Sequence, residues 1–287
     1  MSCNTCETQA IASLCDDIRT LRPLVHCITN YVTVNDCANI LLAAGAAPVM
    51  ADDRAEAAEI ASIAQALVIN IGTLNERTIE SMKLAARAAA KKNIPILLDP
   101  VGAGASALRT KTALSLIEEF RFAAIRGNRS EIAVLLGGQG GTRGVDATGQ
   151  ATEADGETAA RLAEKTGAVV AVTGAVDYIS DGAKILSVSN GHPMMAQITG
   201  SGCMLSALLG AWLASGRAAA RDAGRAEIPG SDLHAAAGGI AAIGLAGEAA
   251  ARVAGAAGTG SFRVALIDAV SRLDGRTLGE GMRLDAR

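Results

Sequence analysis

The sequence has few aromatic side chains, few histidines and no block of positive charge. Only 2% of its 287 residues are aromatic, and the formal net charge is −3. Nucleic-acid-binding proteins present basic patches, and those that bind single strands add aromatic stacking platforms. The composition therefore argues against nucleic acid as the main partner. The three histidines, His26, His192 and His234, lack metal-ligand spacing, so we expect none of them to bind a metal.

A secretory signal and a convincing membrane span are also missing. The first ten residues, "MSCNTCETQA", contain no apolar run. The apolar stretch at residues 203–214 is shorter than the roughly 20 residues that a membrane helix needs. Residues 233–257 are long enough, but they are mostly alanine and glycine and are interrupted by Glu248 and Arg252. We therefore expect buried helices and a cytoplasmic protein without membrane partners.

The six cysteines do not form a disulfide framework or a zinc motif. Cys3 and Cys6 form a Cys-x-x-Cys pair, but no second pair with matching spacing follows. Reduced thiols are expected in a long chain without a secretory signal. Residues 1–8 are expected to form a disordered tail.

Hydrophobic residues make up 50% of the chain, and charged residues make up 19%, which permits a large core. Short β-type runs alternate with helical patterns along most of the sequence. The predicted strands are residues 24–28, 47–49, 66–70, 95–98, 122–125, 169–172, 178–180 and 185–188. The clearest predicted helices are residues 32–43, 76–92, 111–119 and 157–165.

This alternation predicts one α/β domain over residues 1–287, with a mostly parallel central sheet covered by helices on both faces. Turn residues between 172 and 188 predict a local antiparallel hairpin. After Ile198 the chain is expected to be almost wholly helical. The glycine-rich stretch 137–149 is interpreted as a surface loop or lid, and a linker between two domains is the alternative.

Ligands of open parallel sheets bind beyond the carboxyl ends of the strands, so polar residues at strand exits are candidates for a site. Asp99 lies where one strand stops at Pro100, and a carboxylate there can hold Mg²⁺ directly or through water. The alternative is that Asp99 only caps a loop. Gly102, Gly104 and Ala107 match G-x-G-x-x-A, but this dinucleotide fingerprint should open the first strand–helix unit, and here it does not.

The next two exits also carry polar groups. Arg126 follows a strand and can fork onto phosphate, while Glu131 is expected in the first turn of the following helix. The alternative for Asn128 and Glu131 is a capping box beside a surface arginine. Thr173 ends a further strand in a tight turn, where an ordinary hairpin turn is the default interpretation.

The stretch "ITGSGCM", residues 198–204, precedes a long apolar run. Gly200 and Gly202 would let successive backbone N–H groups approach one point at a helix N-terminus, which suits an anion. The chain has no Walker A motif. Cys203 stands where an acid or histidine would usually activate a hydroxyl. It is expected to act as a weak base or a positioning group, and a thiolate of lowered pKa is the alternative.

These stretches together resemble the hydroxyethylthiazole kinase family, of the ribokinase-like fold group. The matching segments are "HCITNYVTVNDCANILLAAGAAPVM", "INIGTL", "LLDPVGAGAS", "IRGNRSEI", "VTGAVDYISDG", "NGHPMM" and "ITGSGCM", and they follow the family order. Ser106 and Ser201 stand where threonine is expected in close relatives, and both keep a hydroxyl.

The resemblance implies ATP- and Mg²⁺-dependent phosphorylation of the primary hydroxyl of 4-methyl-5-(2-hydroxyethyl)thiazole, a step toward thiamine. It also implies a homotrimer with active sites between subunits. Carried over by motif, Met50 and Gly200 would contact the thiazole, Arg126 and Thr173 the ATP, and Asp99 and Glu131 the Mg²⁺. Cys203 would lie beside the reacting hydroxyl, with Asn30 as a polar neighbour. From the residues alone, Met50 is a core methionine, so the resemblance changes its interpretation.

Three rival interpretations remain from the sequence alone. The first is another ribokinase-like enzyme, such as a hydroxymethylpyrimidine kinase or a dehydratase of hydrated nicotinamide cofactors. The second is a nicotinamide-dependent oxidoreductase that uses Gly102 and Gly104. The third is a nucleotide-binding regulator without activity, against which the joint presence of Asp99, Arg126, Glu131 and Cys203 argues.

Overall fold

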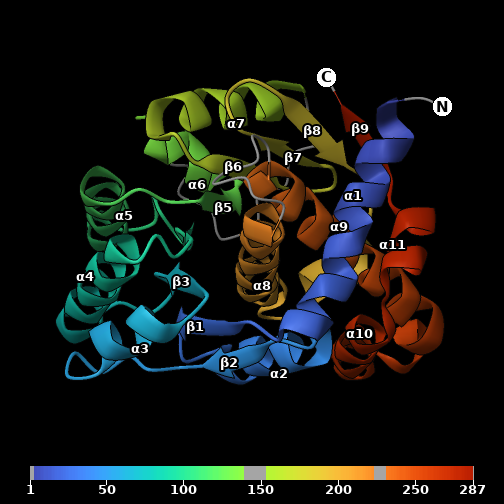
Figure 1. The fold of residues 1–287 in the computed structure, drawn as a ribbon, viewed down its shortest axis with the longest axis horizontal. Coiled ribbons are helices and arrows are strands. Elements are labelled where there is room, and N and C mark those ends of the chain that lie inside the picture. Colours follow the sequence, from blue (N-terminus) through green and yellow to red (C-terminus); the bar gives the residue numbers. More distant parts are fainter. Residues whose placement is uncertain (1–2, 139–152, 223–230, 287) are drawn as a thin grey trace.

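A computed structural model describes residues 3–138, 153–222 and 231–286. One sheet holds nine strands, in the order β2-β1-β3-β4-β5-β6-β7-β8-β9 (Figure 1). The strands are β1 (Leu24–Ile28), β2 (Ala47–Val49), β3 (Ala66–Asn70), β4 (Ile96–Asp99), β5 (Ala124–Asn128), β6 (Val169–Thr173), β7 (Asp177–Ser180), β8 (Ile185–Val188) and β9 (Leu284–Ala286). Every pairing from β2 to β6 is parallel, and the pairings from β6 to β9 are antiparallel.

Helices cover both faces of this sheet, as the strand–helix alternation predicts. The α-helices are α1 (Cys3–Leu21), α2 (Val34–Ala44), α3 (Ala57–Ile63), α4 (Glu76–Lys91), α5 (Ala107–Glu119), α6 (Arg129–Leu135), α7 (Glu153–Thr166), α8 (Ser201–Asp222), α9 (Ser231–Ala254), α10 (Thr259–Arg272) and α11 (Gly275–Gly281). Two short 3₁₀ helices, η1 (Pro193–Gln197) and η2 (Gly255–Ala257), precede α8 and α10.

Two hydrophobic cores lie on opposite faces of the sheet. Val68 of β3 belongs to the core that α1, α2 and α8 to α11 help to form, whereas its neighbours Leu67 and Ile69 belong to the core on the side of α3 to α7. This division follows from the pleat, because successive side chains of a strand point to opposite faces. The α/β fold with a mostly parallel sheet and a helical C-terminal part is confirmed.

The two longest apolar helices lie in the first core. Residues 201–220 of α8 and 232–257 around α9 are long and apolar enough to cross a membrane by length and composition. In the fold, Trp212 of α8 is fully buried, and glycines 238 and 239 of α9 lie against its indole ring. This packing matches the prediction of buried helices.

One sequence prediction needs correction. Residues 3–8, expected in a disordered tail, form the first turns of α1, where Glu7 pairs with Lys184 and His234. The described residues after Ile198 are almost wholly helical, as predicted, apart from β9, which pairs with β8. Short sequence spacing could not reveal that pairing, since about a hundred residues separate the two strands. The predicted lid, 137–149, lies almost entirely outside the described residues.

Candidate active site

The polar strand exits that the sequence singles out come together at one edge of the sheet. Parallel pairing places Asn70 at the end of β3 opposite Asp99 of β4, and Asn128 of β5 opposite Thr173 of β6. The N-terminus of α8, at Ser201, lies against the same edge, because Ser206 in its second turn donates to Asp99. This is the crevice where open parallel sheets bind their ligands.

Asp99 is fully buried, and its two carboxylate oxygens have different surroundings. Oδ2 accepts hydrogen bonds from Asn70 Nδ2 and Ser206 Oγ, each at 2.8 Å. Oδ1 lies 3.7 Å from Arg126 Nη1 and has no hydrogen-bond partner among the described residues. Burial raises the pKa of Asp99 to about 7, against the opposing effect of Arg126 and with a further rise from the Glu131 carboxylate.

Arg126 joins two of the predicted elements. Its Nη2 donates to Thr173 Oγ1 at 2.8 Å, and its Nε is buried without a hydrogen-bond partner among the described residues. The guanidinium also lies against the start of α8, where a Cβ added to Gly202 would come within 2.7 Å of Nη1. A cation and a helix N-terminus therefore meet at one point, which favours a bound anion.

Glu131 forms the capping box that the sequence offered as an alternative. Its Oε1 accepts from Gly102 N and its Oε2 from Asn128 N, each at 2.8 Å, while Asn128 Oδ1 accepts from Glu131 N at 2.9 Å. The buried carboxylate thus holds the loop after β4 to the exit of β5. Gly102 and Gly104 follow β4 and not the first strand, so they do not form a dinucleotide fingerprint.

Gly200 adopts a backbone conformation that favours glycine, with φ +89°. A Cβ there would lie 2.7 Å from Thr33 Cγ2, so the site also lacks space for a side chain. The approach of this loop to the start of α2 brings the N-terminus of α8 close to the exit of β1.

Cys203 lies in the first turn of α8, and two amide groups point at its sulfur. Asn30 Nδ2 donates to Sγ at 3.1 Å and Asn70 Nδ2 donates at 3.3 Å. Burial and the neighbouring Asp99 carboxylate raise the pKa of the Cys203 thiol above its ordinary value, despite these bonds. The alternative of a thiolate with a lowered pKa is therefore wrong for the protein without bound substrates. Burial raises the pKa of the thiol by more than the helix N-terminus lowers it.

Two members of this cluster, Asn70 and Ser206, were not among the residues expected from the sequence. Both are buried and both donate to Asp99 Oδ2. Asn70 ends the predicted strand 66–70, so the strand-exit rule could have identified it. Ser206 lies three residues after Cys203 on the same helix, a spacing that puts the two side chains on one face.

Met50 lies in a different part of the crevice, in a cavity of about 270 Å³. Cys27, Thr29 and Tyr31, in and after β1, line the same cavity. Asn30, between Thr29 and Tyr31, donates to Cys203, so the cavity and the thiol share one chain segment. A flexible thioether and a second sulfur suit a flat apolar ring.

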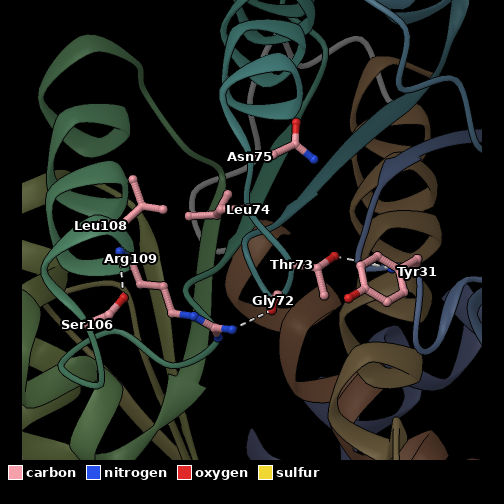
Figure 2. A pocket seen from close by; sticks show the side chains of 8 residues that line it. All are labelled: Tyr31, Gly72, Thr73, Leu74, Asn75, Ser106, Leu108 and Arg109. Carbon is pink, nitrogen blue, oxygen red and sulfur yellow. Dashed lines mark hydrogen bonds between the residues drawn. The ribbon is translucent and has the colours of Figure 1, made fainter.

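A second cavity, of about 260 Å³, adjoins the first, and both are lined by Tyr31, Thr73 and Asn75. Figure 2 shows this second cavity between the start of α4 and the start of α5. Arg109 reaches from α5 to the opposite wall, where its Nη2 donates to the carbonyl oxygen of Gly72 at 2.6 Å.

The donor set fits a magnesium–nucleotide complex better than a metal cage made of protein alone. No group of three potential ligands from histidine, cysteine, aspartate or glutamate occurs in the described part of the chain. Mg²⁺ usually keeps several waters and takes one or two carboxylates plus substrate phosphates. The unpartnered Asp99 Oδ1 is a buried acceptor of the required kind, with Glu131 close to it.

The fold is that of the ribokinase-like group. A ribokinase-like protein from Enterococcus faecalis has the same fold, with a TM-score of 0.56 at 14% identity over 94% of this chain and 83% of its own. The chain belongs to the hydroxyethylthiazole kinase family, whose sequence model matches residues 15–276.

Two relatives support this membership over nearly the full length. A hydroxyethylthiazole kinase from Ruminiclostridium cellulolyticum is 48% identical over 280 residues, which cover 97% of this chain and 98% of the relative. The solved structure of a hydroxyethylthiazole kinase protein from Pyrococcus horikoshii superposes with a TM-score of 0.83. It is 37% identical and is matched over 97% of this chain and 99% of its own.

Proposed function

We propose that this protein transfers the γ-phosphoryl group of ATP to the primary hydroxyl of 4-methyl-5-(2-hydroxyethyl)thiazole, giving the thiazole phosphate and ADP. The observation that carries the proposal is the position of Arg126 between Asp99 and the glycine-rich start of α8, with Cys203 in the same turn. A polyphosphate held there would present its terminal group to an alcohol lying beside the thiol.

In this mechanism the protein positions the reactants and stabilises charge, because phosphoryl transfer has a loose transition state. Arg126 and Thr173 bind the polyphosphate, and the N–H groups at the start of α8 hold the transferring group. Met50 and Gly200 contact the thiazole, and Cys203 orients its hydroxyl. Asp99 and Glu131 would hold Mg²⁺, which neutralises polyphosphate charge when bound.

Further features of the proposal come from the family. The protein is proposed to act as one kinase domain, in the cytoplasm, and as a homotrimer with active sites between subunits. The single nine-stranded sheet supports the one-domain interpretation. The exposed Tyr31 ring, in the wall shared by both cavities, supports a site that a neighbouring subunit completes.

The test is ADP release by the purified protein with ATP, Mg²⁺ and the thiazole alcohol. ADP should form only when all three are present, and the phosphate should appear on the alcohol. Hydroxymethylpyrimidine serves as the control acceptor and should support little turnover. Equal or faster turnover of the pyrimidine alcohol would assign the protein to a different ribokinase-like activity.

Replacing Cys203 by alanine should lower kcat by about tenfold and leave measurable turnover. General-base catalysis typically contributes about 10²–10⁴-fold, and a neutral thiol of raised pKa cannot supply most of it. Steady-state kinetics of the folded variant measures the loss. Cys203→Asp should also stay active, because it places a carboxylate beside the hydroxyl. Complete inactivity of the folded alanine variant would show that the thiol does more than position the alcohol.

A further inference from the structure

Asn70 is an extensively hydrogen-bonded side chain of the site, and no role in the reaction has been given to it so far. It ends β3 and is 1% exposed. Its side-chain amide takes part in four hydrogen bonds, two as donor and two as acceptor. Its partners are Asn30, Gly72, Asp99 and Cys203.

The orientation of this amide is fixed by its partners. Oδ1 accepts from Asn30 Nδ2 at 3.1 Å and from Gly72 N at 2.9 Å, both of which can only donate. A rotation by 180° would place the NH₂ group against these two donors and the carbonyl oxygen against Asp99 Oδ2. The structure therefore allows one orientation, in which both hydrogens of Nδ2 face the site.

One of these hydrogens reaches the nucleotide side of the crevice. Nδ2 donates to Asp99 Oδ2 at 2.8 Å, and Ser206 Oγ donates to the same oxygen. With both donors on Oδ2, the carboxylate presents Oδ1 toward Arg126. The oxygen that is free to meet a cation or its water is thus selected by Asn70 and Ser206.

The other hydrogen reaches the alcohol side. Nδ2 lies 3.3 Å from Cys203 Sγ, and Asn30 Nδ2 donates to the same sulfur at 3.1 Å. A thiol sulfur has two lone pairs, so the two amides occupy both of them. The S–H group is then the remaining polar function of Cys203. The Thr33 side chain bonds to this thiol in the structure, and the oxygen of the acceptor alcohol can take the S–H in its place.

We propose that Asn70 is a positioning residue that couples the two halves of the reaction through one amide group. Asn70 turns Asp99 Oδ1 toward the side of the polyphosphate and turns the Cys203 S–H toward the alcohol. The transferring phosphoryl group and the acceptor hydroxyl are thereby aligned with each other. The proposal rests on the kinase function proposed above and deepens it. Ser206 differs, because its hydroxyl donates to Asp99 and has no hydrogen bond with Cys203 among the described residues.

This difference between Asn70 and Ser206 makes a double-mutant cycle decisive. Asn70→Ala should lower kcat about 10–100-fold, as loss of residues that support ligands commonly does. The KM for the thiazole alcohol should stay within about threefold, because Asn70 does not line the Met50 cavity. In Asn70→Ala/Cys203→Ala the loss should fall short of the product of the single losses by at least about threefold. In Ser206→Ala/Cys203→Ala the losses should multiply.

A second measurement does not depend on turnover. Binding of Mn²⁺ in the presence of ADP, followed by electron paramagnetic resonance, should weaken about tenfold in Asn70→Ala. Asn190→Ala is the matched control, since Asn190 is also a buried asparagine with several hydrogen bonds, but its partners are Glu248, Gly281 and Arg283. That variant should lose stability while keeping kcat and Mn²⁺ binding.

Several outcomes would overturn the inference. They are unchanged kcat in folded Asn70→Ala, losses that multiply with those of Cys203→Ala, or unaltered Mn²⁺ binding. If the alanine variant does not fold, Asn70→Ser, which keeps one donor, should show the same pattern with smaller losses. Wild-type protein that lacks thiazole kinase activity would instead refute the proposed function, so the two failures are distinguishable.

Discussion

Asp99→Asn should lower kcat for the thiazole alcohol about 10³-fold, which is the effect expected when a preorganised charge at a reacting group is lost. The change keeps the shape of the side chain and removes the negative charge beside Arg126. Steady-state kinetics at saturating ATP and Mg²⁺ measures it. Asp268→Asn, on the exposed face of α10, is the control and should retain wild-type kcat.

The same variant should be more stable than the wild type when no metal or nucleotide is bound. The pKa of Asp99 is about 7 in the folded chain against an ordinary 3.8. Between these values the unfolded chain releases this proton while the folded chain keeps it, so wild-type stability falls as pH rises from about 4 to 7. At pH 8 the free energy of unfolding of Asp99→Asn should exceed that of the wild type by at most about 4 kcal/mol. This upper bound follows from about three pKa units at about 1.4 kcal/mol each.

Thermal or urea unfolding of both proteins from pH 4 to pH 8 measures this difference. Asp177, whose pKa burial also raises to about 7, is present in both proteins, so its contribution cancels in the comparison. Parallel stability curves over this range would contradict the prediction. A site that costs stability in the free protein is common where function requires a buried charge.

Arg126→Ala should lower kcat/KM for ATP about 10²–10³-fold, because a fixed donor to the transferring charge is lost at a water-excluded site. Arg126→Lys should recover only part of this loss, since an ammonium cannot contact Thr173 and a phosphate with the same planar fork. The KM for the alcohol should change much less than the KM for ATP.

Initial rates with ATP as the varied substrate measure the effect. Arg121→Ala is the matched control, because Arg121 precedes the same strand at its opposite end and its Nη1 donates to the carbonyl oxygen of Thr166. It should keep its kcat/KM for ATP. A loss in Arg121→Ala as large as that in Arg126→Ala would indicate damage to β5 in place of a nucleotide contact.

The sheet was largely predictable because each of its first eight strands is a short apolar run that ends in a local turn or helix signal. The strand-exit rule then placed Asp99, Arg126 and Thr173 at one edge, and the structure brings them together. β9 was not predictable in this way, because three residues at the chain end carry no periodicity. Its pairing depends on a distant partner strand.

The side-chain network was harder to predict than the positions of its members. Asn70 and Ser206 became visible only when β3, β4 and α8 were placed side by side, since each bonds to Asp99 across a long sequence separation. The thiolate alternative for Cys203 stayed open for a related reason. A helix N-terminus can be read from sequence, whereas the depth of burial that raises the pKa of the thiol comes from packing.

Hydrogen bonds join the first helix, α1, to the segment where α10 ends and α11 begins. Arg19 of α1 donates to the backbone carbonyls of Val270, Ser271 and Leu273, and Asp16 accepts from Gly275 N. Figure 1 shows α1 beside α11, with both termini on the same side of the molecule. The helix α1 packs against α8 and α9 as well as α11, so its contacts are complete only once α10 and α11 have folded beside it.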